Sequence, residues 1–580
     1  MPVQQRARRL PRISTALLIG LVVLVIAGGV LGSLSLLAHF GVLGARTGPP
    51  APSVVRGSTW TAEVGVEPDS FLPNKGEERW YDLALYLPLF YGDAQGTLHP
   101  GAASEVPTVQ NGGISADAKT WTFHLRPGLV WSDGQPYDAR DVDYSWRLWL
   151  NPKFGAFTTR GYDLIKSADV SSDDLSITFH LTQGYAPFLS CWVDGWFAPL
   201  PAHHFSRLAP EAISKEILNP KVTSGPFLLG EYAPADHVTL VRNPRYYRAR
   251  EGLPYLDKVV YRITDVGPLQ DLQAGTITST PTPDVSKVQA YQRLSGYTLI
   301  TSPTNAFFEG MFFNFHNVVL ANHPEVRQAM AMAIDHPALI QMGRHGFAAS
   351  LCTDHGSFYH PGYEVTPPCT PFDPAAAKKL LDDSGWAKGA DGVRTRRGQR
   401  LEFEYSTNVT GNQLRIDIEA ILQRNFRAIG IQLDIENYSS DQIFGHLLPE
   451  GKASPPSGAV AGRYDIAEYE TGPGDGGYDP DDSWMLSCDQ IPPKGKNWDF
   501  YCNPALDALY KQELATADLG VRQQFFNQIH GIYLRELPFI TLYGQTVLSI
   551  VRKGTHNYQI SPLAADFVNI WQWWCDNGKC

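Results

Sequence analysis

An acidic run near residue 480 has the residue types of a hydrolytic site. "YDPDD" places Asp479, Asp481 and Asp482 together, and glycoside hydrolases use two carboxylates as acid and as nucleophile or base. The run follows a Gly-rich loop, however, and neighbouring acids on a turn are more often solvated. No HExxH or GxSxG motif occurs, and "GPGDGG" is not a dinucleotide fingerprint. We therefore expect a protein that is not an enzyme, and keep hydrolysis as an alternative.

A second group of side chains could bind zinc. "CTDHGSFYHPGYEVTPPC" carries Cys352, His355, His360 and Cys369, all of them residue types that ligate Zn²⁺. Their spacing fits no tight zinc pattern, and two cysteines of an exported protein pair more readily with each other. We expect no metal site and no cofactor, with zinc as the alternative.

The seven cysteines all follow residue 190. Proximity along the chain suggests three disulfides and leaves Cys191 over, although pairing cannot be deduced from sequence and other connectivities remain open. The suggested pairs are Cys352–Cys369, Cys488–Cys502 and Cys575–Cys580.

Another acid-rich stretch, "LRPGLVWSDGQPYDARDVDYSW" (125–146), is interpreted as scaffold. A strand with alternating apolar residues precedes it at 121–125, and Pro-Gly and Asp-Gly turns follow. Asp138 has the position of a helix N-cap, and Asp141 lies in the first turn, where the helix dipole favours an acid. Val142, Trp146 and Trp149 then form one apolar helix face. The acids thus have structural roles.

A strand–helix–strand unit is predicted over 401–435. Apolar residues alternate over 401–405 and 431–435, and an apolar stripe from about Asn412 ends at Gly430, a C-terminal cap. Such units build parallel sheets, so the body is expected to be α/β.

The N-terminal segment predicts a membrane anchor. Four arginines within residues 1–12 precede an uncharged run at 13–45, longer than the roughly 20 residues that span a bilayer. The charge bias places residues 1–12 in the cytoplasm and the body on the extracytoplasmic side of the cell membrane. A long signal peptide, cleaved or uncleaved, is the alternative. "TGPPAP" within 46–54 is interpreted as a stiff linker.

The length of the chain indicates how many lobes to expect, and its net charge bears on the class of partner. A chain of 580 residues exceeds what one core usually serves, so at least two lobes are expected. The formal net charge of −11 disfavours nucleic acid as a partner.

The order of several segments resembles one family, the extracytoplasmic solute-binding proteins of ABC importers for oligopeptides, dipeptides and nickel. The resemblance is carried by the stretch at 125–146, "TSGPFLLGEYAPADHVTLVRNPRYY", "NHPEVRQAMAMAID", "FDPAAAKKLLDDSGW" and "LRELPFITLYGQ". It implies a two-lobed, type II periplasmic-binding-protein-like fold with a subdomain inserted in lobe 1. Lobe 1 would comprise 55–92, 196–300 and 540–580, the inserted subdomain 93–195, and lobe 2 301–539.

The resemblance also implies a function and a site. The protein would bind peptides in an interlobe cleft as a monomer and deliver them to an ABC permease. Asp475, or alternatively Asp479, would meet the peptide's amino terminus, Tyr543 would face the ligand, and Glu67 and the segment to Pro73 would line the first-lobe side. A tethered sensor, or a binder of a nickel complex or an oligosaccharide, is the alternative.

Overall fold

The computed structural model describes most of the chain after residue 53. The described residues are 54–65, 67–76, 81–264, 267–281, 285–302, 305–359, 369–408, 413–448, 464–472, 477–563 and 567–580. Among them, no helix is long and apolar enough to cross a bilayer. The predicted membrane segment at 13–45 lies outside the described residues, as do Asp475 and His360.

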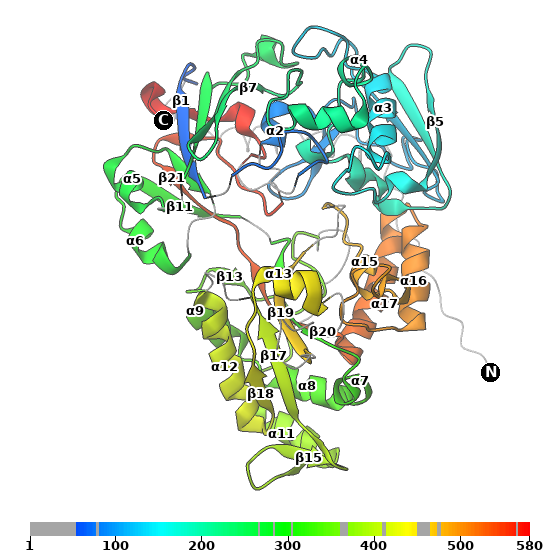
Figure 1. Ribbon diagram of the computed structural model, residues 1–580, viewed down its shortest axis with the longest axis vertical. Helices are drawn as coiled ribbons and strands as arrows, with labels where there is room; N and C mark the ends of the chain where they lie inside the picture. The colour runs from blue at the N-terminus through cyan, green and yellow to red at the C-terminus, as the bar shows by residue number, and fades with distance from the viewer. Residues whose placement is uncertain are drawn as a thin grey trace, which may run out of the picture. The chain divides into compact units, whose positions relative to one another are not determined.

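A seven-stranded sheet forms the first lobe (Figure 1). In order across the sheet its strands are β11 (Tyr297–Thr301), β21 (Leu548–Arg552), β10 (Ser279–Pro281), β1 (Thr59–Val64), β9 (Lys258–Ile263), β8 (His237–Arg242) and β7 (Phe227–Ala233). On β1, Trp60 is fully buried; it donates to Ser279 Oγ at 3.0 Å and stacks on Tyr558. This central strand therefore ties β10 and the C-terminal segment into one core.

A smaller sheet lies within the predicted inserted subdomain. Its strands are β4 (Thr120–His124), β6 (Ser176–Leu181) and β5 (Ile165–Val170), and α3 (Ala139–Trp149) accompanies it. Asp138 caps α3 in a capping box with Asp141, and Val142, Trp146 and Trp149 are buried. The scaffold interpretation of the acids at 138 and 141 is therefore confirmed.

Asp141 has a further structural role that the sequence did not reveal. Its carboxylate accepts hydrogen bonds from Trp131 Nε1 at 3.0 Å and from the backbone N–H of Ala202 at 2.8 Å. Burial nevertheless raises the pKa of Asp141 to about 6, because desolvation outweighs these hydrogen bonds.

A six-stranded sheet forms the second lobe. Its order is β13 (Ala348–Ala349), β20 (Phe539–Gln545), β12 (Phe308–Phe313), β19 (Ile466–Thr471), β17 (Glu402–Thr407) and β18 (Gln432–Ile435). β17 and β18 are parallel and are joined by α12 (Gln413–Ile429), with Gly430 at φ +90° after the helix. The predicted strand–helix–strand unit is therefore confirmed.

Both faces of the second sheet are covered by helices. One face packs against α8 (Pro324–Met332), α9 (His336–Gly343), α11 (Pro374–Asp383) and α12. The other packs against α16 (Pro504–Leu514) and α17 (Leu519–Glu536). All six residues of β12 are buried, which explains its nearly continuous apolar sequence, "FEGMFF".

Shorter elements complete the described residues. The helices are α2 (Asp82–Leu85), α4 (Ala202–Phe205), α5 (Leu269–Ala274), α6 (Val288–Gln292), α7 (Val318–Asn322), α13 (Ser440–Gln442) and α15 (Ser483–Leu486). The strands are β2 (Phe90–Gly92), β3 (Leu98–Pro100), β14 (Ala387–Lys388), β15 (Arg394–Arg396), β16 (Gln399–Arg400), β22 (Thr555–His556) and β23 (Trp574–Cys575).

Two segments connect the sheets. The chain leaves β11 of the first sheet and enters β12 of the second, and it returns from β20 to β21. Because β20 pairs with β12, residues 540–545 belong to the second sheet, although the prediction placed them in the first lobe. The other domain boundaries stay predictions.

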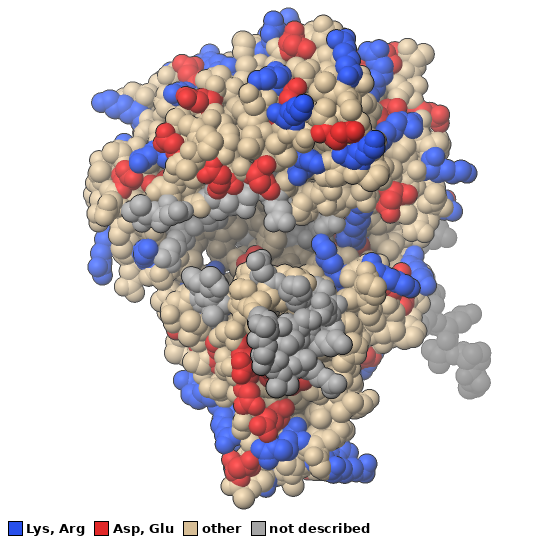
Figure 2. Space-filling view, viewed as in Figure 1, with Lys and Arg blue, Asp and Glu red and all other residues tan. Residues whose placement is uncertain are grey.

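The three suggested disulfides are present: Cys352–Cys369, Cys488–Cys502 and Cys575–Cys580. Cys191 is buried and is not part of a disulfide. On the face shown in Figure 2, acidic and basic side chains are interspersed.

Candidate functional site

The acidic run is a structural anchor in the folded protein. Arg522, on α17, donates to both carboxylate oxygens of Asp479 at 2.8 Å and to Glu513 Oε2 at 2.6 Å. All three side chains are buried. Burial raises the pKa of Glu513 well above its ordinary value even though Arg522 opposes this. Asp479 therefore fixes its loop to α17, and whether it also contacts a ligand stays a prediction.

The next acid connects the two lobes. Arg160, which follows α3 in the chain, forms an ion pair with Asp481 of the second lobe and donates to the Tyr185 hydroxyl at 3.0 Å. Close by, the ring of Tyr478 covers the α-carbon of Gly92, where an added Cβ would lie 2.1 Å from a ring atom. Gly92 thus allows the close approach of the acidic loop to the first lobe.

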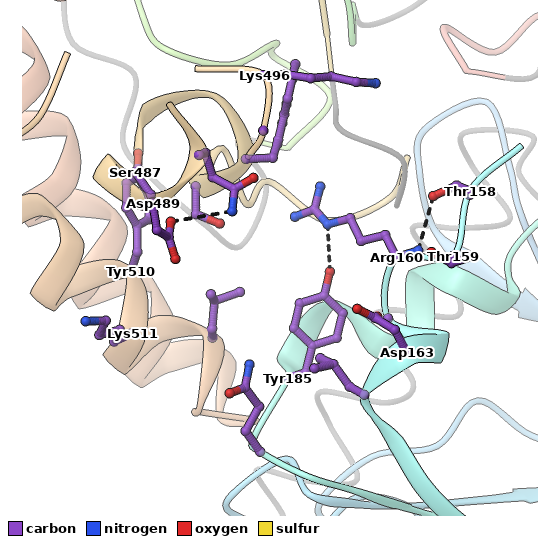
Figure 3. A pocket seen from close by; sticks show the side chains of 18 of the residues that line it. Thr158, Thr159, Arg160, Asp163, Tyr185, Ser487, Asp489, Lys496, Tyr510 and Lys511 are labelled. Carbon is purple, nitrogen blue, oxygen red and sulfur yellow. Dashed lines mark hydrogen bonds between the residues drawn. The ribbon is translucent and has the colours of Figure 1, made fainter. Parts of the chain in front are cut away.

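A cavity of about 750 Å³ lies beside this ion pair (Figure 3). Side chains from within 157–164 and 183–185 line one side, and side chains from within 483–496 and 507–514 line the other. Its wall carries Lys496 and Lys511 as well as Asp489 and Asp507, and Arg160 is engaged by Asp481 and Tyr185. Because basic and acidic side chains are mixed in this lining, its charge does not indicate which ligand the cavity would bind.

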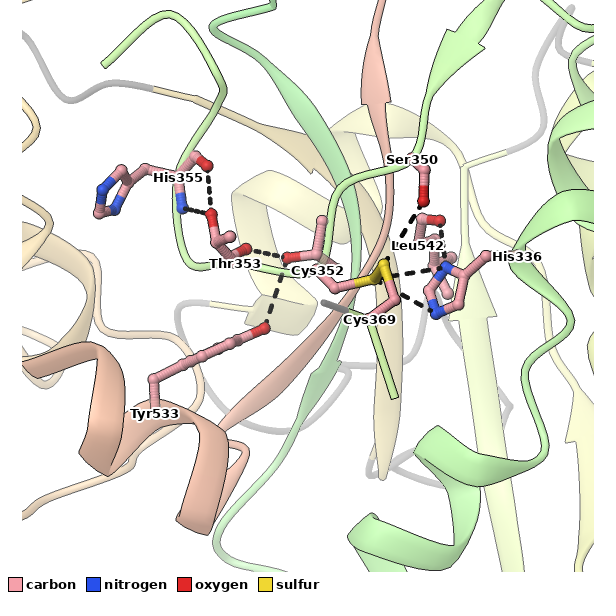
Figure 4. Close-up of a disulfide and its surroundings, with 9 residues drawn as sticks. His336, Ser350, Cys352, Thr353, His355, Cys369, Tyr533 and Leu542 are labelled. Atoms are coloured by element: carbon pink, nitrogen blue, oxygen red, sulfur yellow. Dashed lines mark hydrogen bonds between the residues drawn. A yellow bond between two sulfur atoms is a disulfide. The ribbon is translucent and has the colours of Figure 1, made fainter. Parts of the chain in front are cut away.

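The zinc alternative is contradicted for its two cysteines. Cys352 and Cys369 form a disulfide, so neither can supply a thiolate. Figure 4 shows His336 beside this disulfide and His355 pointing to the other side of the segment. His355 lies instead with the buried acids Asp354 and Asp482.

Tyr543 lies in a row of polar side chains across three strands. Glu309 on β12 is paired with Tyr543 on β20 and with Glu470 on β19. Directly paired residues of antiparallel strands point to the same face of a sheet. The Tyr543 hydroxyl donates to Glu309 Oε2 at 3.5 Å. This row lies close to both segments that connect the sheets, because β12 and β20 are the two strands that join them.

Two arginines cover this row. Arg415, near the start of α12, donates to Glu309 Oε1 at 2.9 Å through Nε. Arg344, directly after α9, places its guanidinium 5.4 Å from the ring centre of Tyr543. Farther in, Glu468 accepts from the Tyr405 hydroxyl at 2.7 Å. Burial raises the pKa values of Glu309 and Glu468, and three glutamates share two guanidinium groups.

Glu470 is the solvent-facing end of the row. Its side chain is exposed, in contrast to the buried Glu309 and Glu468. Protein nevertheless surrounds it, and this desolvation, followed by the charge of Glu309, raises its pKa to about 7. Glu470 is therefore a carboxylate that is accessible to solvent but has limited hydration. A cationic group of a ligand would stabilise the ionised form of Glu470.

Glu67 lies in the first lobe, and its hydrogen bonds are to residues outside the glutamate row. Its carboxylate accepts from the backbone N–H of Ala235 at 3.1 Å and from the Tyr232 hydroxyl, both in or next to the β7–β8 hairpin. Asp475 lies outside the described residues, in the segment that follows β19. The described residues thus connect Tyr543 with Glu309, while Glu67 and Asp479 have other partners.

Sequence reasoning missed the glutamate row and its arginines. A signal was present: Glu309 interrupts the apolar "FFEGMFF", and Glu468 and Glu470 alternate with buried residues in "IAEYET". A charge within a strand that is buried on both faces needs a partner, because an isolated buried ion is strongly destabilising.

Comparisons with known proteins bear on this arrangement. The family described as bacterial extracellular solute-binding proteins, family 5 Middle, matches residues 97–490. The oligopeptide-binding protein AppA of Bacillus subtilis is 24% identical over 476 residues, which cover 80% of this chain and 81% of AppA. Di/tripeptide-binding protein 1 of Pseudomonas aeruginosa is 25% identical over 474 residues, which cover 77% of this chain and 82% of that protein.

Solved structures confirm the fold. AppA from Bacillus subtilis in complex with a nonapeptide superposes with a TM-score of 0.69 at 20% identity, covering 90% of this chain and 100% of AppA. NikZ from Campylobacter jejuni in complex with Ni(L-His) superposes with a TM-score of 0.70 at 20% identity, covering 89% of this chain and 99% of NikZ. At such identities the likeness shows the fold alone, a two-lobed periplasmic-binding-protein-like fold.

Proposed function

Because this chain belongs to the family 5 bacterial extracellular solute-binding proteins, we propose that it captures oligopeptides or dipeptides between its lobes and delivers them to an ABC permease. The observation that carries this proposal is the family match over residues 97–490. The peptide-binding relatives AppA and di/tripeptide-binding protein 1 support the choice of ligand.

The geometry of the second lobe suits a ligand with a free amine. β19 ends at Thr471, and the loop that follows is fixed by Asp479 to Arg522 and by Asp481 to Arg160. A peptide ammonium would meet the carboxylate of Glu470, and we propose that Asp475, five residues later in the chain, supplies a second carboxylate. Main-chain hydrogen bonds would supply affinity that does not depend on the peptide's side chains.

The proposed role is binding without chemical change. Two of the three acids of the hydrolytic alternative, Asp479 and Asp481, are held in ion pairs with arginines. Such carboxylates are poor candidates for proton transfer, since a general acid or base must be within reach of the reacting group. Two-lobed binders close over their solute by hinge motion, and ligand contacts to both lobes favour the closed state.

We further propose that the body is exported and tethered. The sequence of residues 13–45 supports a membrane anchor, with residues 1–12 in the cytoplasm. The three disulfides support an oxidising, extracytoplasmic location. The proposed arrangement is a monomeric body on a tether, close to the permease.

Asp475→Ala should lower the affinity for peptides with a free amino terminus at least about 10-fold. The reason is that the partly desolvated ammonium of the peptide loses one of its carboxylate partners. The same peptides with an acetylated amino terminus should bind wild type and variant equally. Isothermal titration calorimetry on the purified chain, with alanine-based peptides from dipeptides to nonapeptides, measures both.

Asp391→Ala is the control, since Asp391 lies in an exposed turn and pairs with Arg400. It should leave every affinity unchanged. Equal losses for free and acetylated peptides would remove the amine role of Asp475. Failure of every peptide to bind, together with binding of a nickel complex or an oligosaccharide, would replace the peptide proposal with the alternative ligand.

A further inference from the structure

A buried group of acids and histidines lies in the second lobe, apart from the glutamate row. Asp354 and His355 come from the loop after the Cys352 disulfide, and Asp482 comes from the segment before α15. One possible ligand atom from each of these three residues lies within 4.8 Å of the others. All three side chains are more than nine-tenths buried, with exposed fractions of 1%, 6% and 4%.

The carboxylate of Asp482 is buried without the hydrogen-bond partners that a buried acid needs, whether it is ionised or protonated. Neither of its oxygens has a hydrogen-bond partner among the described residues. The Tyr510 hydroxyl faces this carboxylate and favours its ionised form, although the two groups lie outside the geometry of a full hydrogen bond; a single hydroxyl donor could in any case satisfy only one of the two oxygens. An ionised carboxylate requires donors and a protonated one requires an acceptor, so the group is suited to a partner other than these side chains.

The charges around Asp482 are also unbalanced. Five buried carboxylates lie in this region, and two guanidinium groups pair with three of them. Of the other two, Asp354 lies against the imidazoles of His355 and His530, whereas Asp482 has no cationic partner among the described residues. The carboxylates are Asp354, Asp479, Asp481, Asp482 and Glu513, and the guanidinium groups are those of Arg160 and Arg522. A divalent cation between Asp354 and Asp482 would supply the positive charge that Asp482 lacks, and buried ions persist only when they are compensated.

The surroundings hold the candidate ligands in place. His530 on α17 lies with Nδ1 at 2.9 Å from Asp354 Oδ1, and carboxylates that bind metals are commonly supported by such neighbours. The Thr353 hydroxyl donates to the carbonyl of His355 at 2.5 Å and accepts from its backbone N–H at 3.2 Å. The disulfide at Cys352 fixes the start of the same loop (Figure 4).

We propose that Asp354, His355 and Asp482 form a binding site for one divalent first-row transition cation, of which Zn²⁺ is the representative. Imidazole nitrogen together with carboxylate oxygen suits Zn²⁺ and its neighbours in the row, and closed sites of this kind stabilise a fold. The site differs from the zinc alternative of the sequence, because it uses His355 without Cys352 or Cys369. It also departs from the expectation that the protein has no metal site.

The experiment uses the purified, untagged full-length chain, with its disulfides intact, after treatment with a chelator. Calorimetric titration with Zn²⁺ should show one ion per chain, and Co²⁺ should produce a visible absorption band that Zn²⁺ removes. Asp482→Asn should weaken Zn²⁺ binding at least about 10-fold, as expected for the loss of a direct ligand. Asp489→Asn is the matched control in the same segment, and it should bind Zn²⁺ like wild type.

Thermal unfolding separates a metal role from a purely structural one. Zn²⁺ should raise the melting temperature of wild type and Asp489→Asn, but not that of Asp482→Asn, which should still fold without the metal. Absence of Zn²⁺ binding by the wild type would overturn the proposal, and the group would then be a structural network of histidines and acids without a metal. Zn²⁺ binding that is equal in Asp482→Asn and wild type would also overturn it, because the ion would then be bound elsewhere.

Discussion

Arg522→Met should lower the free energy of unfolding by about 3–5 kcal/mol, because it leaves two buried carboxylates without their cation. Arg522 is 2% exposed and contacts Asp479 through two parallel hydrogen bonds, and it also contacts Glu513. Methionine keeps much of the side-chain volume, so the loss reports the charge more than the packing. Urea unfolding followed by tryptophan fluorescence measures the change.

A matched control is available on the same helix. Arg535 lies near the end of α17 with a 65% exposed side chain, 3.7 Å from Glu536. Arg535→Met should change stability by less than about 1 kcal/mol, since exposed ion pairs contribute little. Adding Asp479→Asn and Glu513→Gln to Arg522→Met should recover most of the loss. A small effect of Arg522→Met, equal to that of the control, would show that the pairing does not stabilise the loop.

Arg415→Met should be similarly destabilising, by about 3–5 kcal/mol near neutral pH. Arg415 is the main partner of the buried Glu309, next to Glu468 and the more exposed Glu470. Without it, Arg344 alone would oppose the repulsion among these three glutamates. The variant should also lose ligand affinity if the row lines the binding cleft, and calorimetry with the tightest peptide of the panel measures that.

The pH dependence of this loss has a definite sign. Burial raises the pKa values of Glu309 and Glu468, so the native state keeps protons that the unfolded chain releases at its lower pKa. Stability then falls as pH rises through this window, and removing Arg415 raises these pKa values further. The loss should therefore be smaller at pH 5 than at pH 8. Arg424→Met, an exposed position on the same helix, should change stability by less than about 0.5 kcal/mol at either pH. A loss that does not vary with pH would contradict the charge explanation.

Local elements of the fold could be predicted because their causes are local. Asp138 and Asp141 cap α3 through backbone groups within three residues, and the apolar spacing of 142, 146 and 149 fixes which face is buried. The same holds for the unit at 401–435, in which Gly430 adopts the left-handed conformation that ends α12. The order of strands in each sheet has no such local cause, because contacts such as that of Trp60 with Ser279 join segments more than two hundred residues apart. The two-lobed arrangement was therefore implied only by the resemblance.

The candidate site could be predicted only in part. Tyr543 was selected from its family position, but its partners Glu309, Arg344 and Arg415 come from segments more than a hundred residues away. The roles of Asp479 and Asp481 likewise depend on Arg522 and Arg160, which no local pattern connects to them. A charge alone does not identify its partner, because the partner is determined by the packing of the whole lobe.

The central claim is that this chain binds intact peptides and returns them unchanged. Native mass spectrometry of the purified protein, mixed with an equimolar set of peptides from dipeptides to nonapeptides, tests it most directly. We expect a complex of one chain with one peptide, and release of that peptide at its original mass on collisional activation. Absence of any peptide complex, or release of shortened peptides, would contradict it.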